Sequence, residues 1–481
     1  MESIRESKLF ELLKGFSPAE YKALGDFVLS PYYNKNRSII NLYEYLKKFS
    51  NDFANCKVTN EDISRYVYND RKLNSVKVRS LTSDFVKLIE KFLIASEFET
   101  YGMFHKVLLL YQLNMKDMPK NFRSVLHETM QKQMDTFNRD ENYYYNQIYL
   151  EVESFNYNLE RQHTNVDVGE FKKIGNNIDL FFILTKLNLF HLMFYHRLDI
   201  DESSSYKLWL LDETLEYIES RIDEISKQHP VIYMKYLVLK TITNSGEEHY
   251  FRALKKFALD NVANFDNVTM TYIFGALTNY CTIKCNLGVK KFKLERYKIY
   301  QILDEKKIFD HDKYISYVDF LNAIISSLEI NKVDWAEYFY NKNKDRIFPS
   351  LQEDTLNLAK AQILYMKKNY TDAIKLINNV SYTNHYFYLR SKMLLARLYY
   401  DKNELEPIIY LLDAAKHFLK RNTKVTKMNR DAFGNFFNFM TKILSLKGHK
   451  KPNIKELRDE LLKQTNVSSK EWLLRKLDEM D

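Results

Sequence analysis

Two copies of one residue pattern, 35 positions apart, constrain the fold of this chain more than any other feature. Small residues recur where two helices must approach closely, and large apolar residues recur where each helix must face its neighbour. The first copy consists of Ala361, Leu364, Tyr365, Tyr370, Ala373 and Ile377, and the second of Ala396, Tyr399, Tyr400, Leu405, Ile408 and Leu412. A period in the mid-thirties is typical of stacked helical hairpins, which present extended surfaces rather than deep reaction clefts.

The scarcity of glycine and proline also favours an all-α fold. The 481 residues include 10 Gly and 7 Pro, about 3.5% together, against about 12% in average proteins. Sheets and tight turns depend on both residues for positive φ angles and rigid corners. The sequence also contains no G-x-x-x-x-G-K-[ST], G-x-G-x-x-G, H-E-x-x-H or G-x-S-x-G motif. No short signature of phosphate binding, zinc-dependent hydrolysis or a serine nucleophile is therefore present.

The repeats resemble the tetratricopeptide repeat (TPR). The resemblance covers about 320–418, where a weaker third copy precedes the other two, and it lacks the Gly usual in the first helix of that family. The matching positions are Ala361 and Ala396 in the first helices, Ala336 and Ala373 in the second helices, and Pro349 near the usual closing proline. The resemblance implies a right-handed α-solenoid of TPR-like helical hairpins.

Three short segments near the chain ends look like an uncharacterised family of bacterial all-helical proteins of similar length. They are Phe16-Ser17-Pro18-Ala19-Glu20, Ser30-Pro31-Tyr32-Tyr33-Asn34-Lys35 and Glu471-Trp472-Leu473-Leu474. This resemblance spans the whole chain. It implies an all-helical cytoplasmic protein and transfers no activity, cofactor or site residue.

Helix start and stop signals divide the chain into four parts. They are an N-terminal helical unit over 1–100, connecting long helices over 101–165, a helical-repeat array over 166–450 and C-terminal capping helices over 451–481. Ser17 and Thr59 are predicted N-caps, and Val76 to Glu97 is predicted to be a long amphipathic helix. Pro452 is expected to start one C-terminal helix, and Ser468-Ser469-Lys470-Glu471 to form a capping box for the last.

A basic block makes the C-terminal third a candidate site for anions. Residues 416–455 hold eleven Lys or Arg against one acid, Asp431, and so exceed the net charge of +9 of the whole chain. Such a block attracts nucleic acid, an acidic partner or a membrane surface, whereas the alternative is a solvated face with a basic loop. A second basic run covers 284–298. The candidate anion or nucleic-acid contacts are Lys416, Lys420, Arg421, Lys424, Lys427 and Arg430.

Several observations argue for a soluble, reduced, cytoplasmic protein. The chain has three Cys, too few for a disulfide framework or a four-ligand zinc site, so buried free thiols are expected. The most apolar stretch, 178–194, carries charged residues and is expected to be a buried helix rather than a membrane span. The N-terminus lacks the apolar segment of a signal peptide. His191 lies near His196 and several acids in sequence, but we predict no metal site.

These observations predict a non-enzymatic helical-repeat scaffold or adaptor that mediates protein–protein interaction. The candidate partner-binding residues are Tyr365, Lys367, Tyr399, Tyr400 and Lys402, all near the turns of the two clear repeats. The alternative is a nucleic-acid-binding protein that uses the basic 416–455 segment. No catalytic residue, cofactor, metal or small-molecule substrate is predicted. Aromatic residues make up 15% of the chain, and their even spread along amphipathic segments favours core packing over base stacking.

Overall fold

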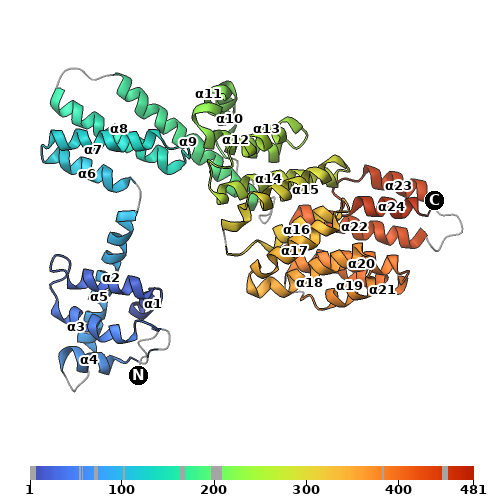
Figure 1. Cartoon of the computed structure of the whole chain (residues 1–481), viewed down its shortest axis with the longest axis horizontal. Coiled ribbons are helices and arrows are strands. Elements are labelled where there is room, and N and C mark those ends of the chain that lie inside the picture. The colour runs from blue at the N-terminus through green and yellow to red at the C-terminus, as the bar shows by residue number, and fades with distance from the viewer. Residues whose placement is uncertain are drawn as a thin grey trace. The chain divides into compact units, whose positions relative to one another are not determined.

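The structure of the chain, a computed structural model, is helical throughout the residues that it describes (Figure 1). These residues are 7–53, 56, 58–69, 74–100, 103–162, 168–196, 208–311, 313–381, 384–446 and 453–480. Over these ranges the only β pairing is an isolated parallel bridge between Ile315 and Ile347. The chain divides into two compact units, one of Met1–Met134 with Asn146–Glu170, and one of Asp135–Tyr145 with Phe171–Asp481.

The first unit begins with five helices around a small core. They are α1 (Lys8–Lys14), α2 (Pro18–Leu29), α3 (Arg37–Leu46), α4 (Asn60–Tyr68) and α5 (Ser75–Thr100), with a 3-10 turn, η2 (Lys47–Phe49), after α3. Helix α5 contacts each of the other four. The predicted caps are confirmed, since Ser17 forms a capping box with Glu20 and Thr59 forms one with Asp62. Helix α5 also confirms the predicted long helix, with slightly wider bounds.

Three further helices follow: α6 (Phe104–Met115), α7 (Pro119–Met134) and α8 (Glu141–Gln162), whose first residues belong to the second unit. Their buried residues form a cluster separate from that of the five-helix part. At its centre the rings of Phe122 and Tyr157 stack with centroids 4.0 Å apart. The first unit therefore holds two cores, one for each group of helices.

The second unit contains most of α9 and all later helices. They are α9 (Val168–His196), α10 (Leu211–Ser220), α11 (Ile222–Gln228), α12 (Pro230–Thr243), α13 (Glu248–Asp260), α14 (Asn267–Asn286), α15 (Lys291–Glu305), η3 (Ile308–His311), α16 (Tyr317–Leu328), α17 (Val333–Asn343), η4 (Lys344–Arg346), α18 (Pro349–Met366), α19 (Tyr370–Asn378), α20 (His385–Asp401), α21 (Leu405–Arg421), α22 (Lys427–Leu446), α23 (Ile454–Lys463) and α24 (Lys470–Asp478). One continuous hydrophobic cluster runs through this unit.

Consecutive helices in the second unit pack as pairs. The pairs are α12 with α13, α14 with α15, α16 with α17, α18 with α19 and α20 with α21. The first helices of neighbouring pairs also touch, as in α12 with α14, α16 with α18 and α18 with α20. The small residues of the repeat, Ala336, Ala361, Ala373 and Ala396, are fully buried at these helix contacts. A larger side chain at any of them has no room without separating two helices.

The turns within four of these pairs share one backbone conformation. Gly288, Asn331, Lys368 and Asn403 all have positive φ angles. After α18, the Lys368 N–H donates to the Tyr365 carbonyl and the Asn369 N–H donates to the Leu364 carbonyl, which is the Schellman pattern. The same two bonds recur at the other three turns, and between α6 and α7 at Asp117. Lys368 and Asn403 are 35 residues apart, so the backbone repeats with the period of the sequence.

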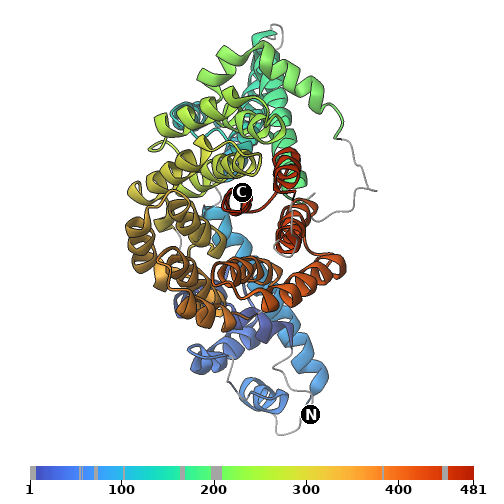
Figure 2. The ribbon, with the colours of Figure 1, turned by 90° about the vertical axis from the view of Figure 1, so that its right-hand side faces the viewer.

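The last helix lies against the inner side of this run of pairs. In Figure 2 the dark red C-terminal helix is surrounded by the yellow, orange and red helices of the second unit. Helix α24 packs on α22 and α23. The predicted capping box is wrong: Ser469 is the N-cap, its φ of 52° is left-handed, and its side chain makes no cap bond. Helix α23 has Asn453 as its N-cap, and Pro452 lies outside the described residues.

Helix α9 differs from the expected buried helix. Leu184 and Leu187 are fully buried, but Phe171, Ile178 and Leu192 are about half exposed. One face of α9 thus packs on the second unit's core while the other stays uncovered. Of the helices in the described parts of the chain, none combines the length and apolarity that a bilayer crossing needs.

Candidate interaction surfaces

All five predicted partner-binding residues lie at the C-terminal ends of α18 and α20, and they divide into two kinds. Lys367 and Lys402 are the C-cap residues of those helices. Each forms an ion pair, Lys367 with Glu337 and Lys402 with Glu404. A cation at a helix C-terminus also interacts favourably with the helix dipole. These two lysines are therefore partly exposed positions with a local structural role.

The three tyrosines lie deeper. Tyr365 and Tyr400 are buried, at 6% and 7% exposure, and Tyr399 is half-buried against the core. The chain's own last helix, α24, contacts both Tyr365 and Tyr400 through Trp472. In this conformation they do not form an open aromatic strip for another molecule, so their predicted contact with a partner requires α24 to leave.

A chain of polar contacts joins α24 to α18 and α20. The Trp472 indole N–H donates to the Tyr365 hydroxyl over 2.8 Å, and that hydroxyl donates to the Asp401 carboxylate over 2.6 Å. Lys476 forms an ion pair with the same carboxylate at 2.8 Å, with both side chains about 10% exposed. The Asp401 carboxylate therefore has the Tyr365 hydroxyl at one oxygen and the Lys476 amino group at the other.

Arg397 lies beside these groups, with its guanidinium 4.5 Å from the Tyr365 ring centre and 5.7 Å from that of Trp472. A cation over these ring faces adds attraction between α20 and α24. Burial opposes the charge on Lys476, but the bonds to Asp401 and Glu479 raise its pKa. Burial raises the pKa of Tyr365, which keeps its hydroxyl protonated as a donor.

The sequence did not reveal this network. Arg397 and Asp401 flank a repeat position, and Trp472 and Lys476 are more than 70 residues further along the chain. No local pattern connects such distant residues. The composition of the last helix could have indicated a specific contact, because Glu471, Trp472 and Lys476 accompany its apolar residues.

The predicted anion-binding residues do not form one uniform surface. The Lys416 amino group donates to the Thr441 hydroxyl at 2.7 Å. Arg430 donates to the carbonyls of Leu419, Asn422 and Val425 and so fastens the turn between α21 and α22. These two cations have structural partners.

The other four candidates, Lys420, Arg421, Lys424 and Lys427, are exposed around the same turn. Lys420 and Arg421 lie in the last turn of α21, where cations oppose the negative end of the helix dipole. Within the described parts of the chain, no acid pairs with Lys420, Arg421 or Lys424. Of the six predicted anion contacts, these four are the exposed ones, and they lie around one turn.

Half of the six cations in the second basic run have acidic partners. Lys291 pairs with Glu248, Lys293 with Glu471 and Arg296 with Glu329. Within the 416–455 block, Phe433, Phe436, Phe437 and Phe439 are buried in the core, and Phe418 is partly buried against it. Because their charges are paired, Lys291, Lys293 and Arg296 do not extend the basic block into a continuous positive surface.

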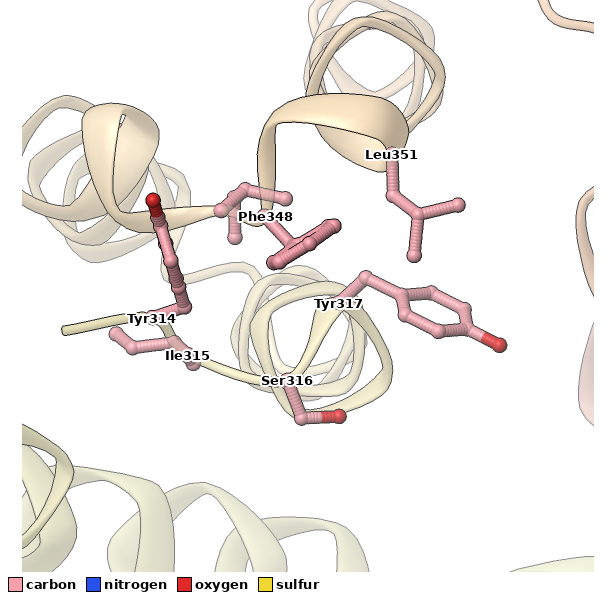
Figure 3. A pocket seen from close by; sticks show the side chains of 7 residues that line it. Tyr314, Ile315, Ser316, Tyr317, Phe348 and Leu351 are labelled. Carbon is pink, nitrogen blue, oxygen red and sulfur yellow. The ribbon is translucent and has the colours of Figure 1, made fainter. Parts of the chain in front are cut away.

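An apolar pocket of about 190 Å³ lies between the segment before α16 and the turn that leads into α18 (Figure 3). The rings of Tyr314 and Phe348 meet edge to face with centroids 5.3 Å apart. The lining residues are Tyr314, Ile315, Ser316, Tyr317, Ile347, Phe348 and Leu351. None of these side chains is charged, so the pocket offers a place for an apolar group and no acid, base or nucleophile of ordinary reactivity.

Reactive side chains elsewhere are buried or dispersed. Burial raises the pKa of Cys281, and it raises that of Cys285 to about 11, so both remain thiols at neutral pH. All three cysteines are free; Cys56 and Cys281 are buried as predicted, whereas Cys285 is only partly buried. Across the ranges that the structure describes, no three His, Cys, Asp or Glu side chains gather as metal ligands would. Comparison of the chain with protein-family models, with curated proteins and with solved structures gives no match in any of the three.

Proposed function

We propose that this chain is a non-enzymatic helical-repeat scaffold, a right-handed α-solenoid of TPR-like hairpins that binds another protein in the cytoplasm. The observation that carries the proposal is the seating of α24 on α18 and α20. A helix already occupies the inner surface of the repeats through an aromatic anchor and matched charges. This is the helix-in-groove mode of recognition. The recurring Schellman turns support the solenoid part of the proposal.

Site-specific photo-crosslinking in cells tests this function. A photo-reactive amino acid replaces Lys367 or Lys402, the two predicted contacts that are partly exposed, in chain expressed at its native level. A matched control carries the same group at Lys120, an exposed position on α7. We expect a discrete protein adduct from the repeat positions and none from the control. If neither repeat position yields a protein adduct, the scaffold function is wrong.

The alternative function is nucleic-acid binding, which the exposed cationic turn at Lys420, Arg421, Lys424 and Lys427 favours. If each of these four cations neutralises one phosphate, log K for duplex DNA falls with log[salt] at a slope of about −3.6. Affinity then drops roughly 10²-fold between 50 and 200 mM salt.

Replacing all four residues by Glu should remove both the binding and its salt dependence. The control reverses four exposed lysines of α2, α5 and α7, namely Lys22, Lys87, Lys91 and Lys120. Equal losses in the two variants, or no detectable binding of DNA or RNA at about 50 mM salt, exclude the cationic turn as a specific nucleic-acid site.

A further inference from the structure

The surface beneath α24 has the features of a receptor for a helix. It is built from residues of several helices: Lys293 of α15, Tyr365 of α18, Arg397, Tyr400 and Asp401 of α20, and Phe436 of α22. Trp472 is the anchor, because its ring meets that of Tyr400 edge to face at 5.5 Å while its N–H reaches Tyr365. Leu473 and Leu477 are fully buried on the same helix.

Two ion pairs join α24 to this surface. Glu471 pairs with Lys293 at one end of α24, and Lys476 pairs with Asp401 further along. A buried ion pair roughly breaks even against the cost of desolvating its two charges. Such pairs select a helix of the right sequence and register, and they add little to the stability of the fold.

Helix α24 depends on this surface for its own structure. It has nine residues, and isolated helices of that length are marginal in water. Its N-cap, Ser469, makes no side-chain cap bond. The predicted capping partner, Glu471, instead pairs with Lys293. The turn 464–469 is the covalent connection between α23 and α24.

We propose that the surface beneath α24 is the docking site for an amphipathic helix of a partner protein, and that α24 occupies this site until such a helix displaces it. The partner helix carries an acid, then a tryptophan and a leucine, and a lysine or arginine four residues after the tryptophan. This proposal rests on the proposed scaffold function and names its partner class. In the resting chain, α24 holds the site closed as an intramolecular competitor.

The test uses the full chain and a fluorescent synthetic peptide of residues 465–481. In the wild-type chain the tethered α24 competes at an effective concentration in the millimolar range, so the peptide binds weakly. Trp472→Ala weakens the tethered helix and should raise peptide affinity at least tenfold. Adding Asp401→Asn to that variant should reverse most of the gain. The peptide carrying Trp472→Ala is the matched control and should not bind.

Lys476→Glu provides a second release variant, because it reverses one charge without removing the aromatic anchor. Both variants are checked for a cooperative thermal transition and unchanged helix content. If either folded variant binds the peptide no better than the wild type does, loss of α24 does not open a binding site, and the proposal fails. If both variants lose cooperative folding, α24 is an inseparable part of the core, and the proposal fails as well.

The partner class is tested by selecting displayed helical peptides on the Trp472→Ala chain. We expect enrichment of tryptophan followed four residues later by lysine or arginine, and a consensus without this spacing contradicts the proposal. Alternatively, two copies of the chain could exchange α24. Light scattering would then show a dimer of the wild-type chain. That result would assign the site to a second copy and contradict the proposal of a partner helix. None of these outcomes bears on the crosslinks at Lys367 and Lys402, so the scaffold function stands or falls separately.

Discussion

At the residue scale, single positions of this chain are constrained by close contacts that composition alone does not reveal. Tyr21 and Tyr43 stack with ring centroids 4.9 Å apart, and each hydroxyl donates to the other residue's backbone carbonyl. Gly25 lies against this pair, and a Cβ built on it would lie 2.2 Å from the Tyr43 hydroxyl oxygen. The small residue is therefore required by packing rather than by its backbone angles.

Gly25→Ala should destabilise the five-helix part of the first unit by about 1–3 kcal/mol, the usual cost of overpacking a buried contact. Chemical denaturation followed by tyrosine fluorescence measures the change. Gly175→Ala on α9 is the control, because its added Cβ meets no atom within 4 Å. That substitution should be neutral or slightly stabilising, since alanine favours a helix over glycine. Equal effects of the two substitutions contradict this account.

A buried histidine links stability to pH. His191 on α9 is 3% exposed, and neither ring nitrogen has a hydrogen-bond partner. Lys235 of α12 and Tyr272 of α14 lie nearby, with the lysine over the tyrosine ring and that ring 5.6 Å from the imidazole. Burial, with a smaller contribution from Lys235, lowers the pKa of His191 to about 3. The folded chain therefore holds this ring neutral.

The unfolded chain takes up that proton near pH 6.5, well before the folded chain does. The stability from His191 is present above pH 6.5 and falls as the pH drops from 6.5 towards 3, by up to about 1.4 kcal/mol per pH unit. His191→Leu should remove this one-proton dependence from the pH profile of unfolding. NMR titration of the ring checks the cause directly, and a ring that titrates near pH 6.5 in the folded chain shows the explanation to be wrong.

At the element scale, the turns explain how a chain with few glycines ends so many helices. Positive φ angles are easiest for Gly, then for Asn and Asp, and unfavourable for most other residues. The chain uses Gly288, Asn331, Asn403 and Asp117, and even Lys368, at equivalent Schellman turns. Low glycine content correctly predicted that the described ranges would contain helices and no sheet, but it did not predict that these helices end in left-handed turns.

These turns give a graded prediction. Lys368→Gly should stabilise the second unit by about 0.5–1 kcal/mol, because lysine is strained at φ 61°. Asn403→Gly should be nearly neutral, since asparagine tolerates this conformation. Gly288→Ala should cost about 1 kcal/mol, although no atom lies within 4 Å of the added Cβ. Thermal unfolding of the three variants should follow this order, and a stabilised Gly288→Ala chain is the result that contradicts it.

Local signals predicted elements well where the helix cap is formed by neighbouring residues. Ser17 with Glu20 and Thr59 with Asp62 form capping boxes because both partners are within one turn. The equivalent prediction at Ser468 to Glu471 was wrong because Lys293, far away in sequence, takes the carboxylate of Glu471. Similarly, Arg430 was predicted to bind anions but binds three backbone carbonyls of its own turn. Sequence spacing carries no information about such long-range partners.

At the scale of the whole molecule, the chain contains separate hydrophobic cores. The residues of the five-helix core, the α6–α8 core and the core of the second unit fall into three distinct clusters. Cooperativity arises within a shared core, and domains that have their own cores behave as separate folding units. The sequence predicted successive helical parts from start and stop signals, but which helices share a core depends on contacts between distant residues.

Matched core substitutions should therefore act on separate unfolding transitions. Leu42 in α3 and Leu358 in α18 are both fully buried leucines, one in the five-helix core and one in the core of the second unit. Replacing either by Ala should cost about 2–5 kcal/mol through lost burial and the cavity left behind. In calorimetry, Leu42→Ala should lower one transition and Leu358→Ala another, while the remaining transitions keep the wild-type midpoint. If both substitutions lower every transition equally, the cores fold as one cooperative unit. Release of α24 would then also lower the stability of the first unit.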